Sequence, residues 1–367
     1  MYSRQSHDSS RRNAIKMAVA GAASIVTGAT LAGPSVITSS RTNSKQIVVR
    51  DSGGLFSQRY AEILYEPFAK KTGIKVIGVA SEEEPAAQIR AMVRTKRYLW
   101  DMASLGQSAI LFLTSGKECF LEEHGLEREL VISSIPPQFR SLYGVGTHIY
   151  STVLAYRTDV FKNSRAVPQS WKDLWDVNNF RGRRGLRKHP FDTVEVALMA
   201  DGVPPGNVYP CDLDRAFQGL DRIKPHIAVW WRNGAQIEQL VKSGEVDLLQ
   251  AYADRVQLAI DAGAPVAFSW DQHIYGCDTW AILKDTPNAD ICREFIKFAS
   301  DPKRQALLAP YGIVPTQPEA LKYISEKQAR RLSIHPDNFK KGLYIDALYW
   351  MNNQDLAIER FNQWMLS

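Results

Sequence analysis

The sequence predicts an α/β protein built of two lobes, and three observations lead to that prediction. Short apolar segments alternate with amphipathic helical segments, which is the pattern of βα units around a doubly wound parallel sheet. The alternation runs twice along the chain, and extended apolar segments near 151–155 and 272–277 connect the two runs. With 367 residues and 45% hydrophobic content, the chain is long enough for two domains.

The first run of elements follows a linker rich in serine, threonine and asparagine. The helix after the first strand keeps its apolar residues on one face and is expected to end at Gly73, because glycine readily adopts a left-handed conformation. The expected strands are 46–50, 74–79 and 99–105, and the second helix is 86–96.

Two loops of this first run are candidate ligand contacts. In doubly wound sheets, ligands lie beyond the carboxyl ends of the strands, where loop backbone can approach them. The loop with Gly53 and Gly54 and the loop with Gly106 and Gln107 both follow expected strands. Glycine at such a position is also expected for turn geometry alone, so both interpretations stay open.

The second run forms the second lobe, and its last elements return to the first. Its expected strands are 185–187, 228–231, 246–252 and 265–270, and its helices begin at 193, 213, 236 and 255. A strand at 276–283 and a helix at 289–300 follow. We therefore assign 46–151 and 278–322 to lobe 1, and 156–274 and 323–367 to lobe 2. Crossing segments between two lobes predict a cleft that closes by hinge bending.

The N-terminal segment predicts export. Arg11 and Arg12 precede a weakly hydrophobic run at 17–32, which is typical of a twin-arginine signal peptide spanning 1–32, although Ala14 replaces the preferred Phe or Leu. A membrane anchor is the alternative, but the glycines of this run make a poor membrane span. We expect a periplasmic protein with no other membrane segment.

Charge and motif content exclude several function classes. The net charge of +6 falls to +3 without residues 1–32, which hold four basic residues and one acidic residue. That charge is too mild to indicate nucleic-acid binding, and the basic run at 181–188 is expected to be a solvated entry to a strand. The four cysteines and seven histidines show no ligand spacing, so no metal or cofactor is expected. Neither a hydrolase triad motif nor a phosphate-binding loop occurs.

Asp278 is the most informative single residue, because it interrupts an aromatic and apolar strand at 274–283. A carboxylate there costs several kcal/mol to desolvate unless a cation or several donors meet it. Strand alternation places Gly276, Asp278 and Trp280 on one face, which combines an acid with an aromatic wall and suits an amine. The alternative is an internal ion pair with a lysine or arginine.

Several stretches together resemble the polyamine-type receptors (the spermidine/putrescine-binding-protein-like family) of bacterial ABC importers. Each stretch is weakly specific, but their number and order cover nearly the whole chain after the signal. They are 66–76, 100–101, 151–156, 171–175, 182–187, 200–204, 230–231, 261–265, Asp-Thr-Trp at 278–280, and 358–364.

The resemblance implies the two-lobed type II periplasmic binding fold, with a primary amine held in the cleft by carboxylates and aromatic side chains. It places Asp278 on the family's amine-pairing acid, Tyr252 at an aromatic wall, and Asp192 near a second acidic position. Asp192 also precedes Glu195 by three residues, which is the arrangement of a helix capping box.

Departures from the family pattern change the expected solute. The spermidine receptor has another acid ahead of that second acidic position, where this chain has His189-Pro190. It also has an aromatic residue in place of Gly276, and a Trp-Thr pair in place of Gly53 and Gly54. A long polycation needs an anion at each end, so a shorter zwitterion fits this cleft better.

A carboxylate end of such a zwitterion requires a cation. Arg232 and Arg255 both follow strands whose carboxyl ends should face the cleft, and arginine binds carboxylates through two parallel hydrogen bonds. An exposed loop charge for Arg232 and an interlobe ion pair for Arg255 are the alternatives. Trp231, which ends the strand before Arg232, completes the expected contacts.

The resemblance implies a monomeric receptor that captures a small amine-bearing solute and delivers it to an inner-membrane ABC permease. The alternative is an exported enzyme on the same fold, similar to thiaminase-like transferases, which use a cysteine nucleophile beside an acid. Cys277 and Asp278 are the candidate pair, but alternation points them to opposite faces.

Overall fold

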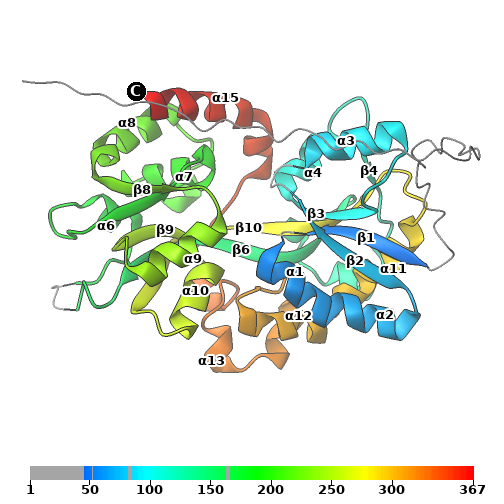
Figure 1. Cartoon of the computed structure of the whole chain (residues 1–367). Coiled ribbons are helices and arrows are strands. Elements are labelled where there is room, and N and C mark those ends of the chain that lie inside the picture. The colour runs from blue at the N-terminus through cyan, green and yellow to red at the C-terminus, as the bar shows by residue number, and fades with distance from the viewer. Residues whose placement is uncertain (1–44, 52, 82–84, 163–165) are drawn as a thin grey trace, which may run out of the picture. The chain divides into compact units, whose positions relative to one another are not determined.

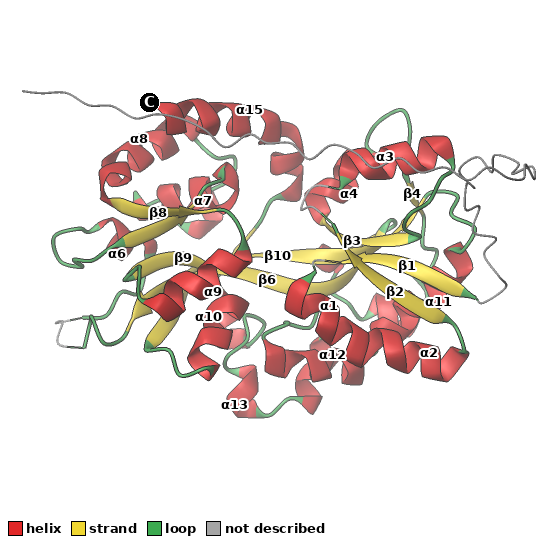
Figure 2. Ribbon diagram, in the orientation of Figure 1, coloured by secondary structure: helices red, strands yellow, loops and turns green. Residues whose placement is uncertain are grey.

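A single mixed sheet runs through the computed structural model, which describes residues 45–51, 53–81, 85–162 and 166–367 (Figures 1 and 2). The sheet order is β2-β1-β3-β10-β6-β9-β7-β8, with β4 and β11 added to β10 and β5 to β6. The strands are β1 Gln46–Asp51, β2 Lys75–Ala80, β3 Met102–Gly106, β4 Leu121–Glu122, β5 Arg140–Ser141, β6 Gly144–Arg157, β7 Arg184–Arg187, β8 Ile227–Trp231, β9 Leu248–Tyr252, β10 Val266–Leu283 and β11 Leu343–Tyr344. The predicted signal segment 1–32 lies outside the described residues.

Helices cover both faces of this sheet (Figure 1). On the side of β1 to β3, which we call the β1 half, α3 and α4 lie on one face and α1, α2 and α12 on the other. On the side of β7 to β9, the β9 half, α7 and α8 lie on one face and α9 and α10 on the other. The helices are α1 Gly54–Tyr60, α2 Glu66–Thr72, α3 Ala86–Thr95, α4 Gln107–Thr114, α5 Leu130–Ser133, α6 Trp171–Trp175, α7 Pro190–Ala200, α8 Leu213–Ile223, α9 Gly234–Ser243, α10 Ala253–Asp261, α11 Ala289–Ala299, α12 Pro302–Leu308, α13 Glu326–Ala329, α14 Pro336–Phe339 and α15 Ala347–Leu366. In the part of the chain that the structure describes, none of the helices has the length and apolar character needed to cross a membrane.

Two long strands, β6 and β10, join the two halves. The expected parallel pairing is present at both ends of the sheet, where β1 pairs with β2 and β3, and β7 with β8 and β9. The centre differs, because β10 runs antiparallel to β3 and β6, and β6 runs antiparallel to β9. This follows because β6 carries the chain from the β1 half to the β9 half and β10 carries it back.

β10 is one strand where the sequence predicts two, at 265–270 and 276–283. Its register with β6 shifts between Ser269 and Ile274, and Gln272 has a positive φ of 57°. The indole of Trp171 donates a 2.8 Å hydrogen bond to the Gln272 carbonyl, which holds the irregular backbone in place. The connection near 272–277 is therefore a bulge inside a continuous strand.

A π-helical turn interrupts the first predicted helix. The turn spans Ala61–Tyr65 and joins α1 to α2, and Pro67 lies in the first turn of α2. Proline lacks an N–H, so the carbonyl four residues earlier, that of Ile63, loses its α-helical donor. Arg304 donates to that carbonyl at 3.4 Å instead. As predicted, Gly73 ends α2 in a left-handed conformation, with φ 73°.

The predicted capping box at Asp192 is wrong. The N-cap of α7 is His189, whose ring accepts from the Phe191 N–H at 3.2 Å, while Asp192 has a non-helical φ of 68°. The Asp192 carboxylate bonds instead to Arg187 and Thr152, so it does not act as the helix cap. Glu195 is equally occupied elsewhere, because it accepts from the Tyr209 hydroxyl and the Trp350 indole, both at 2.6 Å.

The basic run at 181–188 is also not simply solvated. Arg184 is fully buried, and its guanidinium donates to the carbonyls of Leu174 and Gly182 at 2.8 and 2.7 Å. Backbone carbonyls that lack helical or strand partners make a buried arginine favourable here. Composition alone does not distinguish such a residue from a surface charge.

Candidate functional site

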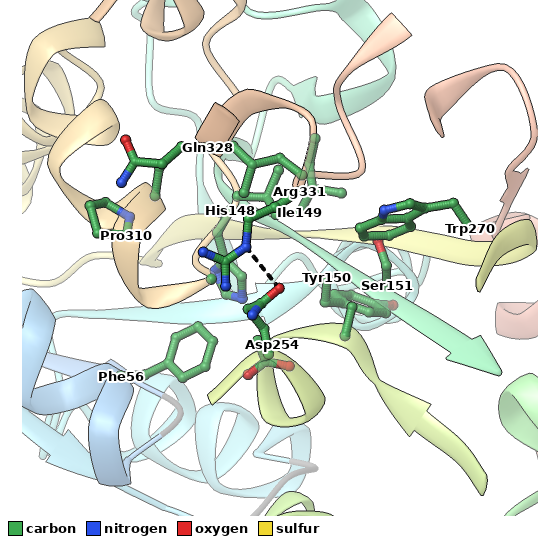
Figure 3. A pocket seen from close by; sticks show the side chains of 16 residues that line it. Phe56, His148, Ile149, Tyr150, Ser151, Asp254, Trp270, Pro310, Gln328 and Arg331 are labelled. Atoms are coloured by element: carbon green, nitrogen blue, oxygen red, sulfur yellow. Dashed lines mark hydrogen bonds between the residues drawn. The ribbon is translucent and has the colours of Figure 1, made fainter. Parts of the chain in front are cut away.

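A small hollow, with about 50 Å³ of water-accessible space, lies where β6 leaves the β1 half and meets α10 of the β9 half. Figure 3 shows Phe56, His148, Tyr150, Asp254 and Trp270 around it. These residues come from α1, β6, α10 and β10, so elements of both halves meet in it. Together they combine aromatic surface with a titratable acid and a histidine, the composition expected of a small-molecule site.

Asp278 lies beside this hollow and faces His148. The His148 Nε2 atom is 3.8 Å from an Asp278 carboxylate oxygen, and the Asp278 side chain is 23% exposed. His148 Nδ1 contacts the hydroxyls of Tyr60 at 2.9 Å and Thr147 at 2.8 Å. Burial lowers the pKa of His148, which outweighs the nearby carboxylates of Asp278 and Asp254, so the ring is neutral at neutral pH.

Among the described residues, His148 is the basic group within ion-pair distance of Asp278, and no lysine or arginine lies that close. The internal ion pair that the sequence left open is therefore absent from this part of the chain. A largely buried carboxylate beside a neutral histidine keeps most of its charge available for a cation.

Asp254 is a second carboxylate of the hollow, and the sequence reasoning missed it. It is the second residue of α10, and its side chain lies 3.3 Å from Arg255 Nε. Burial raises the pKa of Asp254, while Arg255 and His148 act in the opposite direction. Arg255 also extends over the Phe56 ring, with its guanidinium 5.5 Å from the ring centroid, so this arginine reaches from one half to the other.

Asp192 lies in a different arrangement from the predicted one. Its carboxylate accepts from Arg187 at 3.2 Å and from Thr152 at 3.0 Å, and it is buried. The guanidinium of Arg187 lies within 6 Å of the rings of Trp231 and Tyr252, at 5.8 and 5.7 Å. The charge of Asp192 is therefore paired within the protein. The sequence reasoning did not single out its partner, Arg187, as a cation near the predicted contacts Trp231 and Tyr252.

The two predicted loops contribute unequally. Gly106 lies opposite Asp278 in the pairing of β3 with β10, and an added Cβ would be 3.8 Å from its carboxylate. Gly53 has φ 72°, and its N–H donates to Asp51 at 3.0 Å, while Gly54 is exposed. Gln107 is held by internal hydrogen bonds, because its amide donates to the Gln138 carbonyl and accepts from the Tyr344 hydroxyl.

The three predicted aromatic residues also differ in position. Trp280 is only 2% exposed and is enclosed by the rings of Tyr60 and Phe295, so it is a core residue and not a cleft wall. Trp231 is fully buried, and its indole donates to the Gln250 carbonyl at 2.8 Å. Tyr252 is half-buried beside Trp231 and directly precedes α10, the helix that carries Asp254.

Arg232 is exposed in the loop between β8 and α9. The loop nevertheless lies close to Arg255, because an added Cβ at Gly234 would be 3.1 Å from Arg255 Nε. Arg255 therefore lies against the first turn of α9, which begins two residues after Arg232.

Cys277 lacks the properties of a nucleophile. Its side chain is buried, and burial together with the nearby Asp278 raises the pKa of its thiol well above the usual range. A neutral, enclosed thiol does not attack a substrate. Cys119, Cys211, Cys277 and Cys292 are all free thiols. In the described ranges, no group of three or more His, Cys, Asp or Glu side chains has the arrangement of a metal site.

The fold, with a hollow where its two halves meet, is that of bacterial solute-binding proteins. The family model described as "Bacterial extracellular solute-binding protein" matches residues 64–331. The chain therefore belongs to that family, whose members bind solutes outside the cytoplasm.

Several individual proteins are similar to this chain over most of its length. The chain is 33% identical to the gamma-aminobutyric acid-binding protein of Pseudomonas aeruginosa, over 88% of this chain and 92% of that protein. An ABC transporter substrate-binding protein from Bradyrhizobium japonicum is 35% identical, with a TM-score of 0.82 over 88% of this chain and 99% of the other. The Atu4243 GABA receptor is 31% identical, with a TM-score of 0.77 over 87% and 97%.

Proposed function

We propose that this protein is a periplasmic receptor that captures an amino-acid-like zwitterion, such as an ω-amino acid, between the two halves of its sheet. The observation that carries the proposal is Asp278, a largely buried carboxylate beside a neutral histidine and without a lysine or arginine partner in the described ranges. A cation that fills this position would be a ligand group. A primary amine provides that charge and donates hydrogen bonds as well.

The amine end would lie between Asp278 and Asp254. Both carboxylates act on His148, and Asp254 lines the hollow with it, so the three groups are neighbours. Asp254 shares its charge with Arg255, whereas Asp278 does not. We therefore assign the larger part of the amine affinity to Asp278.

The carboxylate end would meet Arg255 and Arg232. Arg255 lies between Phe56 and the first turn of α9, and the loop just before that turn carries Arg232. A guanidinium binds a carboxylate through two parallel hydrogen bonds. The GABA-binding relatives support a solute with one amine and one carboxylate.

A polyamine is the alternative solute, because the sequence resembles polyamine-type receptors. Its second ammonium would need another available carboxylate, and Asp192 is already paired with Arg187. A zwitterion matches the arrangement of charges better.

The remaining elements of the proposal concern transport. We place the lobes at 46–151 with 278–322 and at 156–274 with 323–367, and the receptor would close by bending at β6 and β10. It would act as a monomer, reach the periplasm by the twin-arginine pathway, and deliver its solute to an inner-membrane ABC permease without performing chemistry.

A thermal-shift and calorimetry panel tests this function. The mature protein is titrated with γ-aminobutyrate, α-amino acids, diamines, spermidine, betaine and glucose. A ligand at about 100 times its Kd should stabilise the protein by about 2.7 kcal/mol, which corresponds to a shift of several degrees. Tighter binding of spermidine than of every amino acid would refute the zwitterion, and binding of glucose alone would refute the amine site.

A further inference from the structure

The ring of Tyr150 covers the strand floor next to the proposed amine site. Tyr150 lies opposite Gly276 in the pairing of β6 with β10. A Cβ atom added at Gly276 would be 2.3 Å from the Tyr150 hydroxyl oxygen and 2.5 Å from Cζ of its ring. The phenol end therefore rests on the backbone of Gly276 and fills the volume that any larger side chain there would need.

Tyr150 stands between two charged centres on one face of β6. Alternate residues of a strand share a face, so His148, Tyr150 and Thr152 form a row. At one end His148 faces Asp278 at 3.8 Å, and at the other Thr152 donates to Asp192 at 3.0 Å. At a strand rise of about 3.3 Å per residue, the row spans roughly 13 Å.

A guanidinium lies beyond the second end of this row. Arg187 is 3.2 Å from Asp192, and its side chain is 12% exposed. Tyr150 itself borders the hollow that holds Asp254, and along β6 it lies between His148, which also lines that hollow, and Thr152, which contacts the Asp192–Arg187 pair. Burial raises the pKa of Tyr150, and both Asp192 and Asp278 add to the effect, which agrees with a neutral phenol placed between the two carboxylates.

We propose that Tyr150, resting on Gly276, sets the maximum length of the solute by closing the path from Asp278 to the Asp192–Arg187 pair. The inference rests on the proposed function, because it takes Asp278 as the amine site. On this proposal a solute of four carbons would lie on the Asp278 side of the ring. Without the ring, a longer ω-amino acid could keep its amine at Asp278 and extend its carboxylate towards Arg187.

A chain-length series tests the inference. Calorimetry is performed with ω-amino acids of four to seven carbons on the wild-type protein and on Tyr150→Ala. The wild type should prefer the short members, and Tyr150→Ala should move the optimum by about two carbons. The ratio of the six-carbon to the four-carbon affinity should rise roughly tenfold or more, since two additional methylenes become buried.

Two further variants separate ring volume from other effects. Tyr150→Phe retains the ring and should retain the preference for short members, since volume and not the hydroxyl sets the limit. Tyr156→Ala removes a ring from the same strand outside the site and should leave the length profile unchanged. If Tyr150→Ala does not fold, Tyr150→Leu replaces it, with the same shift expected in smaller degree.

The outcomes distinguish the two levels of the argument. A wild-type protein that binds no ω-amino acid refutes the proposed function, and the inference falls with it. A wild-type protein that binds the short members, together with an unshifted optimum in the folded Tyr150 variant, overturns the inference alone.

Discussion

Replacing Asp278 with asparagine removes one charge from the proposed amine site and nearly preserves the side-chain shape. Two unit charges 4 Å apart interact by about 4 kcal/mol at an effective dielectric constant of 20. Because Asp278 is 23% exposed, water screens part of that interaction. We therefore expect a loss of about 2–4 kcal/mol of binding free energy, or roughly 30- to 1,000-fold in Kd.

The stability of the unliganded Asp278→Asn variant is the second half of this prediction. A buried ion pair that loses one partner costs about 3–5 kcal/mol of folding free energy, because the other charge is left uncompensated. No lysine or arginine of the described ranges pairs with Asp278, so we expect a change below about 1 kcal/mol.

Calorimetry with γ-aminobutyrate measures the affinity, and thermal unfolding without ligand measures the stability. Asp290→Asn is the matched control, because it makes the same change on α11 at a side chain that is 98% exposed. Affinity close to the wild-type value in Asp278→Asn, or a collapsed melting temperature, would refute the assignment of Asp278 as the amine site.

Four further predictions follow from the site, the fold and the signal segment. Burial raises the pKa of Asp254, so as the pH falls the affinity for the amine should begin to drop at a pH above the usual aspartate range. Calorimetry should show a flatter pH profile in Asp254→Asn, and an unchanged profile would exclude Asp254 from the amine site. Burial lowers the pKa of His273 to about 4, so this residue's contribution to stability is complete above pH 6.5 and declines by about 3 kcal/mol towards pH 4. Urea denaturation at several pH values should show a weaker dependence of stability on pH in His273→Gln. The same dependence as in the wild type would contradict the assignment of this decline to His273. Solute binding should reduce the radius of gyration in X-ray scattering, whereas a constant radius would contradict closure at β6 and β10. Replacing Arg11 and Arg12 with lysine should retain the precursor in the cytoplasm, as judged by cell fractionation, and continued export would exclude the twin-arginine pathway.

The sequence was sufficient for the two-run α/β pattern, because that prediction depends on the spacing of apolar residues. It also located Asp278, since a carboxylate within an apolar strand stands out in any composition window. Gly106 was found by a different rule, namely that ligands of doubly wound sheets lie beyond the carboxyl ends of the strands.

Residues whose role depends on tertiary contacts could not be located in this way. Asp254 has the signature of an ordinary acid in the first turn of a helix, and only the approach of β6 makes it a wall of the hollow. Arg187 lies within the basic run at 181–188, which composition assigns to solvent. Trp280 has the aromatic character of a cleft wall, but Tyr60 and Phe295 enclose it. A search for acids directly after predicted strands would have found Asp254, two residues past β9.

The shared strands β6 and β10 have a consequence for engineering this receptor. Each strand belongs to both halves, so a gene fragment that encodes one half would end inside a strand and leave the central sheet positions without hydrogen-bond partners. Split reporters that divide the chain between its halves should therefore fail to reassemble as independent modules. Fluorescent reporters belong instead on surface loops such as the turn at Gly263, where the chain changes direction outside both shared strands.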